Sequence, residues 1–373
     1  MLWNESQRLS GVKISLIRQV MEAAPPEALN LALGELSFPM PQALKDEACR
    51  LLNASTPCYT PNAGLNEARE VIATLYPQST AANICICNGA EEALYIILLA
   101  LTNPDDTIAI PDPDYTAYPS LGRLHATVIT RLPFEGDLCS INWKQWEQIL
   151  AQDVKLLMLS SPSNPSGYAY TETDMKLLGE ICNRHGIIMV VDEIYSTLYF
   201  AEKPCDKWHL FFDRLVRING LSKSHCLSGW RIGWLQAPSE IIGSMIKAKQ
   251  YISTCSHWLS QKLVPFALSH PELAEDIRQQ LNTNWLHSKQ LLNTKLPPFC
   301  RKAHIPTASP YIMLKLTGEI DIATAKALAA HGIITVPGSA FGELGRGWIR
   351  MNIGVMPAVL QQGLKLLYSF NEV

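Results

Sequence analysis

Short runs of apolar, often β-branched residues alternate with helix-length segments between residues 80 and 240. The runs are ICIC (84–87), TIAI (107–110), TVIT (127–130), KLLMLS (155–160), IIMVV (187–191) and LVRI (215–218). Continuous apolar runs of this kind are typical of strands that are buried on both faces of a sheet. The intervening helices supply the crossovers that parallel strands require. The pattern therefore predicts an α/β fold built on a mostly parallel sheet.

Chemically distinctive residues follow these runs, at the points where the predicted strands end. In chain order they are Gly89, Ala90 and Glu91 at the start of a helix, then Tyr115, Asn164, Asp192, and the pair Ser222 and Lys223. In open α/β sheets, ligands bind outside the carboxyl ends of the strands. We therefore expect these residues to converge on one site.

These residue types match the needs of one cofactor. The amine of Lys223 can form a Schiff base with an aldehyde, and the Asp192 carboxylate can keep a pyridine nitrogen protonated. Tyr115 can stack on a ring. A helix N-terminus binds phosphate through its free N–H groups, and Arg231, which lies between glycines, can add a charged donor. The set points to pyridoxal 5′-phosphate (PLP).

The chain resembles the class I/II aminotransferases, which are PLP-dependent enzymes of fold type I. Nine segments carry the resemblance in the order of the family: LALGELSFPMP, YTPNAGLNEARE, NGAEEAL, PDPDYTAYP, SPSNPSG, VVDEIY, LSKSHCLSGWRIG, VPGSAFG and WIRMNIG. The resemblance implies a large domain at 41–264 with a seven-stranded, mostly parallel sheet. It also implies a small α+β domain formed by 1–40 and 265–373.

The resemblance also implies a role for each site residue. The catalytic residues would be Lys223, Asp192 and Tyr195. The cofactor would be bound by Gly89, Ala90, Glu91, Tyr115, Asn164, Asp192, Tyr195, Ser222, Lys223 and Arg231, together with Tyr59 of a partner chain in a homodimer. The substrate would be bound by Gly34, Asn164 and Arg350, with Arg350 gripping the α-carboxylate. The Asn164–Pro165 bond is a candidate for the cis form.

Three departures from the family pattern bear on the substrate. Gly220 stands where many members have Ser or Thr as a phosphate donor. No arginine occurs from Ile232 to Ile277, where relatives specific for dicarboxylates supply one. The segment PTASPYIMLKL (306–316) replaces the usual glycine-aromatic loop that faces the substrate side chain. We therefore expect a non-dicarboxylic substrate.

The expected function is transamination between an amino acid and a keto acid. The same residues also serve PLP-dependent lyases and cyclases, such as enzymes similar to capreomycidine synthase that act on an arginine derivative. No motif decides between these reactions. A third reading is a non-catalytic regulator on this fold, but the intact Lys223, Asp192 and Arg350 argue against it.

Composition limits the partners and the location. The net charge of −3 without basic clusters predicts no binding of nucleic acid. No apolar run is long enough to cross a membrane. The ten cysteines lack both CxxC and metal-ligand spacing, so we expect reduced thiols in the cytoplasm and no metal site.

Overall fold

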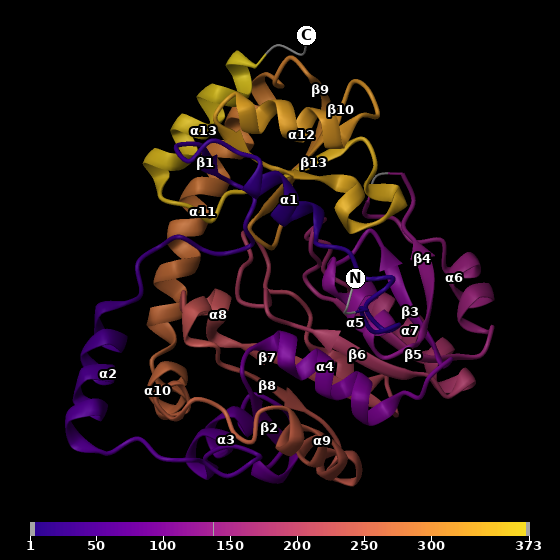
Figure 1. The fold of residues 1–373 in the computed structure, drawn as a ribbon, viewed down its shortest axis with the longest axis vertical. Helices are drawn as coiled ribbons and strands as arrows, with labels where there is room; N and C mark the ends of the chain where they lie inside the picture. Colours follow the sequence, from indigo (N-terminus) through magenta and orange to yellow (C-terminus); the bar gives the residue numbers. More distant parts are fainter. Residues whose placement is uncertain (1–3, 137, 371–373) are drawn as a thin grey trace.

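The computed structural model describes residues 4–136 and 138–370. Seven strands form one sheet in the order β2-β8-β7-β6-β5-β3-β4 (Figure 1). The strands are β2 (Ile84–Cys87), β3 (Thr107–Asp112), β4 (Val128–Pro133), β5 (Val154–Ser160), β6 (Ile188–Asp192), β7 (Leu215–Gly220) and β8 (Gly233–Gln236). Strand β8 is antiparallel to both of its neighbours, and the other pairs are parallel. The predicted seven-stranded, mostly parallel sheet is confirmed.

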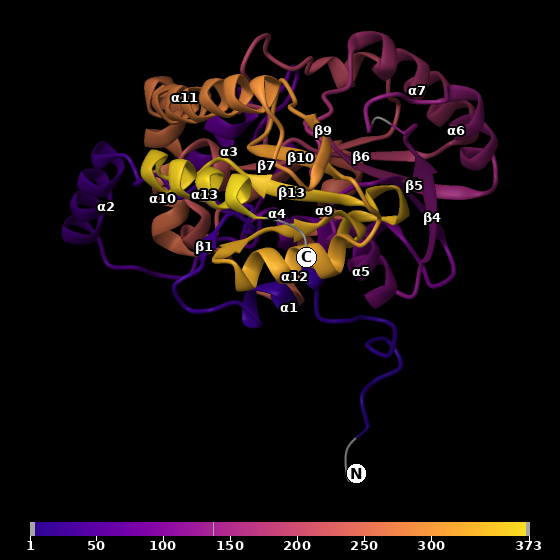
Figure 2. The ribbon, with the colours of Figure 1, turned by 90° about the horizontal axis from the view of Figure 1, so that it is seen from above.

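Helices cover both faces of this sheet, which explains why its central strands are mostly apolar. Along β5, Leu156 and Met158 pack into the cluster that contains α4 (Ala90–Leu101), α5 (Ala117–Leu124) and α9 (Ser239–Ile252). Leu157 and Leu159 pack on the opposite face, in the cluster that contains α6 (Trp143–Leu150) and α7 (Glu172–His185). Figure 2 shows α7 and α5 on opposite sides of the strands. Successive side chains thus enter two different cores.

A smaller, four-stranded antiparallel sheet lies beside the first, in the order β12-β13-β10-β9. Its strands are β9 (Cys300–His304), β10 (Tyr311–Leu316), β12 (Val336–Pro337) and β13 (Trp348–Asn352). The helices that accompany it are α11 (Pro271–Thr294), α12 (Asp321–Ala330) and α13 (Pro357–Ser369). This arrangement matches a small α+β unit at the C-terminal end of the chain.

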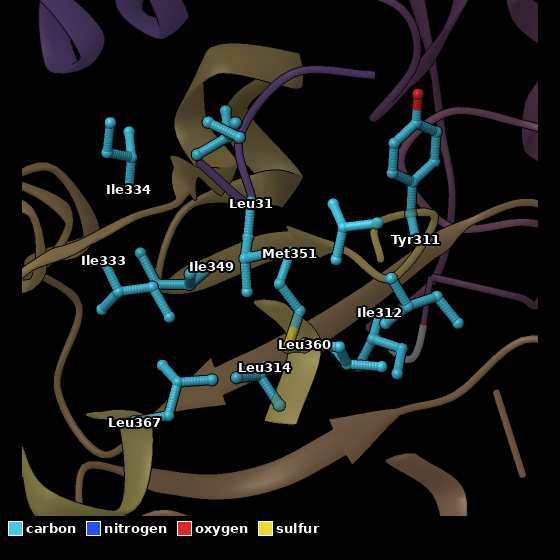
Figure 3. Close-up of a cluster of buried hydrophobic side chains, with 14 of the residues drawn as sticks. Leu31, Tyr311, Ile312, Leu314, Ile333, Ile334, Ile349, Met351, Leu360 and Leu367 are labelled. Atoms are coloured by element: carbon cyan, nitrogen blue, oxygen red, sulfur yellow. The ribbon is translucent and has the colours of Figure 1, made fainter. Parts of the chain in front are cut away.

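The N-terminal segment joins this smaller unit. Strand β1 (Leu29–Asn30) pairs in parallel with β11 (Ile333–Ile334), and Leu31 packs into the same hydrophobic cluster as Ile312 and Leu314 (Figure 3). The remaining helices are α1 (Leu16–Glu22), α2 (Gln42–Ala54), α3 (Asn66–Ala73), α8 (Leu221–Ser224) and α10 (Trp258–Ser269). The domain limits at 40/41 and 264/265 stay a prediction. Within the described part of the chain, no helix combines the length and apolar character needed to cross a membrane.

Candidate active site

A cavity of about 510 Å³ opens at the carboxyl ends of β3, β5, β6 and β7. Among the residues that line it are Gly34, Ala90, Glu91, Tyr115, Asn164, Asp192, Tyr195, Ser222, Lys223, Arg231 and Arg350. These are nearly all of the residues that the sequence singled out. The exceptions are Gly89, which adjoins Ala90, and Tyr59, whose side chain is 89% exposed. The parallel sheet thus gathers residues that are far apart in sequence, as its topology requires.

Lys223 lies on the short helix α8, directly after β7. Its Nζ donates a hydrogen bond of 2.5 Å to the Gly34 carbonyl oxygen. Burial lowers the pKa of Lys223 to about 8, and the positive charges of Arg231 and Arg350 act in the same direction. An amine with this pKa is neutral more often than an ordinary lysine, which favours attack on a carbonyl carbon.

Asp192 is the last residue of β6 and is 4% exposed. Its carboxylate accepts hydrogen bonds from the Ile194 N–H (3.0 Å) and the Tyr118 hydroxyl (3.3 Å). Burial raises the pKa of Asp192 to about 7. Within residues 4–136 and 138–370 this carboxylate has no ion-pair partner, so a protonated ring nitrogen would complete its environment.

Tyr118 is a site residue that the sequence reasoning missed. It lies three residues after Tyr115, at the start of α5, and the two rings meet edge-on with centroids 5.4 Å apart. Tyr118 also lines the cavity. The motif PDPDYTAYP contains both tyrosines, but Tyr115 precedes α5, so helical spacing alone does not pair them.

Gly89 and Arg231 form the part of the cavity that suits an anion. Gly89 precedes α4 with φ 87°, which strains any larger residue, and a Cβ atom on it would lie 2.4 Å from Nη2 of Arg231 and displace the guanidinium. The Arg231 guanidinium donates to the carbonyl oxygens of Asn88 (3.2 Å) and Ser228 (3.0 Å). It is thereby held beside the N-terminus of α4, whose free N–H groups attract phosphate.

Arg350 is 1% exposed and lies between two aromatic rings. The carbon at the centre of its guanidinium is 4.2 Å from the Tyr311 ring centroid and 4.8 Å from that of Phe341. Nη1 donates to Oδ1 of Asn164 (2.7 Å), and Nη2 donates to the Ala32 carbonyl oxygen. Its Nε is buried without a hydrogen-bond partner among the described residues. A buried cation that lacks a carboxylate partner is suited to binding an anionic ligand.

Asn164 is fixed by polar groups behind it. Its backbone N–H donates to Oγ of Ser160 (3.2 Å), and that hydroxyl donates to Asp114 (2.7 Å). The Asn164–Pro165 bond is cis, as predicted. Asp114 and Ser160 were not identified from the sequence.

Two tyrosines complete the wall of the cavity. The Tyr115 hydroxyl donates to Oε2 of Glu91 (3.2 Å). The Tyr195 hydroxyl lies 2.6 Å from the hydroxyl of Tyr311, a residue that had been noted only as part of an unusual loop. The stacking role of Tyr115 and the cofactor contact of Tyr195 stay predictions. Tyr59 does not line the cavity of its own chain, and its role in a partner's site stays a prediction.

The residues fit PLP group by group. A lysine amine of lowered pKa suits its aldehyde, the unpaired Asp192 carboxylate suits its ring nitrogen, and the cradle at Arg231 suits its phosphate. In the part of the chain that the structure describes, no group of three or more His, Cys, Asp or Glu side chains could hold a metal ion. Fold and cavity together define a PLP-dependent enzyme of fold type I.

Comparisons with known proteins extend this assignment. The family model of aminotransferase class I and II matches residues 26–367. The chain is 29% identical to a probable aspartate aminotransferase of Methanocaldococcus jannaschii, over 98% of this chain and 100% of that protein. It is 28% identical to a probable N-acetyl-LL-diaminopimelate aminotransferase of Bacillus subtilis, over 96% of this chain and 93% of that protein. The structure of Thermus thermophilus aspartate aminotransferase with maleate superposes with a TM-score of 0.90 at 23% identity, covering 98% of this chain and 99% of that chain.

The chain belongs to the aminotransferase class I and II family. It is an enzyme whose cofactor is PLP, and amino acids and keto acids are the substrates that fit this family.

Proposed function

We propose that this enzyme transaminates a non-dicarboxylic amino acid. The charges around the cavity support the proposal. Of the Arg and Lys side chains that line it, Lys223, Arg231 and Arg350 are each assigned to the cofactor or the α-carboxylate. Arg18, an exposed residue of α1, is the remaining one among the described residues. Glu35 and Glu91 line the same cavity, and their charges would repel a second carboxylate on the substrate.

In this proposal the chain's own residues divide the work. PLP supplies an electrophilic carbon and a ring that accepts electrons. Lys223 would hold the cofactor covalently and would take up the proton that leaves the substrate α-carbon. Asp192 holds the ring nitrogen in its protonated form, and Tyr115 lies against the ring. Arg350, oriented by Asn164, binds the substrate α-carboxylate as a planar fork.

A dicarboxylic substrate is the second candidate. The relative from Methanocaldococcus jannaschii is named a probable aspartate aminotransferase. Arg18 lines the cavity and forms no ion pair within the described residues, so it could meet a distal carboxylate. The two candidates therefore differ in what Arg18 does.

A panel of amino acids distinguishes these candidates. Aspartate and glutamate are compared with leucine, phenylalanine and arginine, and keto-acid release is measured for each. We expect kcat/KM for the best substrate among leucine, phenylalanine and arginine to exceed kcat/KM for aspartate by about tenfold or more. The reason is that one unfavourable charge contact costs about 1.4 kcal/mol or more. The Arg18→Gln variant should leave this preference unchanged. A preference for aspartate that disappears in Arg18→Gln would show that the substrate is dicarboxylic.

We further propose that the active unit is a homodimer, with Tyr59 completing the phosphate site of the partner chain. The exposure of Tyr59, which lies between α2 and α3, supports this proposal. The cytoplasmic location and the division into domains at 41–264 and at 1–40 with 265–373 also stay proposals. The two separate sheets support that division.

A complementation experiment tests the dimer. Equal amounts of inactive Lys223→Ala and impaired Tyr59→Phe chains are unfolded and refolded together. Random pairing gives one half heterodimers, each with one intact site, so about a quarter of wild-type activity should return. Tyr251→Phe, at another exposed tyrosine, serves as the control for Tyr59→Phe. A fully active monomer in sedimentation would rule out the shared site.

A further inference from the structure

Tyr311 links two parts of the cavity that the proposed function treats separately. We propose that Tyr311 is a positioning residue whose hydroxyl orients the Tyr195 hydroxyl toward the ring oxygen of the cofactor. The ring of Tyr311 also supports Arg350. The inference rests on the proposed roles of Tyr195 and Arg350 and adds a residue to them.

Tyr311 reaches this position from the smaller sheet. It is the first residue of β10, pairs with Asn352 of β13 and is 0% exposed. Figure 3 shows its ring beside the aliphatic cluster of that sheet, with the hydroxyl directed away from the labelled leucines and isoleucines. A phenol in a core normally turns its hydroxyl toward a polar partner. Here that partner is a residue of the active site.

The contact with Tyr195 is short and well enclosed. The two hydroxyl oxygens are 2.6 Å apart, and the rings meet edge-on with centroids 5.5 Å apart. Both residues are buried, which raises the pKa of each phenol, so both stay protonated at neutral pH. The charge of Arg350 opposes the rise in pKa at both phenols. A hydrogen bond in this dry setting is stronger than one in water.

Gly34 shows how closely this hydroxyl is surrounded. A Cβ atom on Gly34 would lie 2.3 Å from the Tyr311 hydroxyl oxygen and 3.7 Å from that of Tyr195. The Gly34 carbonyl oxygen also accepts the hydrogen bond from Lys223. The segment that holds the lysine amine therefore rests directly on the tyrosine pair, and only glycine leaves room for it.

Counting protons fixes the direction of the hydrogen bonds. Each phenol carries a single donor hydrogen. If Tyr195 gives its hydrogen to the ring oxygen of the cofactor, its contact with Tyr311 requires Tyr311 to donate to Tyr195. The resulting chain runs from Tyr311 through Tyr195 to the cofactor, and donors in such a chain strengthen one another. Replacing Tyr311 by phenylalanine would remove the first donor of this chain. The Tyr195 hydroxyl would then be free to rotate about its C–O bond.

The pH dependence of the cofactor absorbance reports on this chain without measuring turnover. A donor to the ring oxygen withdraws negative charge from it, so the proton held between that oxygen and the Lys223 nitrogen leaves at a lower pH. In Tyr311→Phe the midpoint of the absorbance titration should therefore move to higher pH, by about half to one pH unit. We expect kcat to fall by about three- to tenfold, with KM within about twofold of wild type, since Arg350 keeps the ring beneath it.

Two further variants separate the possible outcomes. Tyr170→Phe removes a buried hydroxyl outside the cavity and should leave the midpoint unchanged. Tyr195→Phe should move the midpoint more than Tyr311→Phe does, and adding Tyr311→Phe to it should have no further effect. If Tyr195→Phe does not move the midpoint, the proposed role of Tyr195 is wrong. The positioning role of Tyr311 is wrong if Tyr195→Phe moves the midpoint and Tyr311→Phe does not. It is also wrong if the shifts of the two single variants add in the double variant.

Discussion

Replacing Lys223 by alanine should reduce turnover by about 10⁴-fold or more, because the proposed function has this lysine both hold the cofactor covalently and move the substrate proton. The variant should still bind PLP, since Asp192 and the phosphate cradle at Arg231 remain. Borohydride reduction followed by peptide mapping measures the covalent link directly. Wild-type enzyme should be modified at Lys223, whereas the variant should carry no adduct.

The matched control is Lys247→Ala, which removes an exposed lysine of α9. It should retain both the activity and the adduct at Lys223. Two results would contradict the assignment: a reduced adduct on another lysine in wild-type enzyme, or a Lys223→Ala variant that turns over at a comparable rate.

Replacing Arg350 by lysine should weaken substrate binding by about 1.5–3 kcal/mol, which corresponds to roughly 10- to 150-fold in affinity. Lysine keeps the positive charge but loses the planar fork that binds a carboxylate through two parallel hydrogen bonds. It also leaves the Asn164 side chain without its present donor. Cofactor affinity should change little, because the groups proposed to hold the phosphate and the ring nitrogen lie on other elements.

The substrate dependence of the single-turnover rate measures the loss of substrate affinity. Titration with PLP measures the affinity for the cofactor. The control is Arg346→Lys, an exposed arginine just before β13. A thermal melt establishes that the buried substitution leaves the fold intact. Unchanged substrate dependence in folded Arg350→Lys would mean that the α-carboxylate binds elsewhere.

Residues that follow strands could be predicted from the sequence because sheet topology places them. Asp192 ends β6 and Lys223 follows β7, and parallel neighbours bring their ends to one edge of the sheet. Six of the seven strands were evident as apolar runs, whereas β8 was not among those runs. Arg350 was identified through its motif, and the structure shows a buried cation without a carboxylate partner among residues 4–136 and 138–370.

Tyr311 could not be placed in this way, because it reaches the site by packing between two sheets. It is 116 residues from Tyr195 and belongs to a strand of the four-stranded sheet, although both tyrosines lie in one hydrophobic cluster. No periodicity of the sequence encodes that meeting. The position of Arg231 is likewise not set by the strand that precedes it. Its left-handed backbone (φ 51°) and its fit against Gly89 depend on where β8 begins. Tyr59 depends on a second chain, so a single chain leaves its role a prediction.

Transfer of the amino group to the cofactor is tested most directly by adding an amino acid to PLP-loaded enzyme with no keto acid present. An aminotransferase must stop after one half-reaction, because the amino group stays on the cofactor. We expect one keto acid per site, conversion of the absorbance to that of the pyridoxamine form, no ammonia, and renewed turnover once a keto acid is added. A lyase or cyclase regenerates its cofactor in every cycle. Many turnovers without an acceptor would therefore contradict transamination and favour elimination or ring closure.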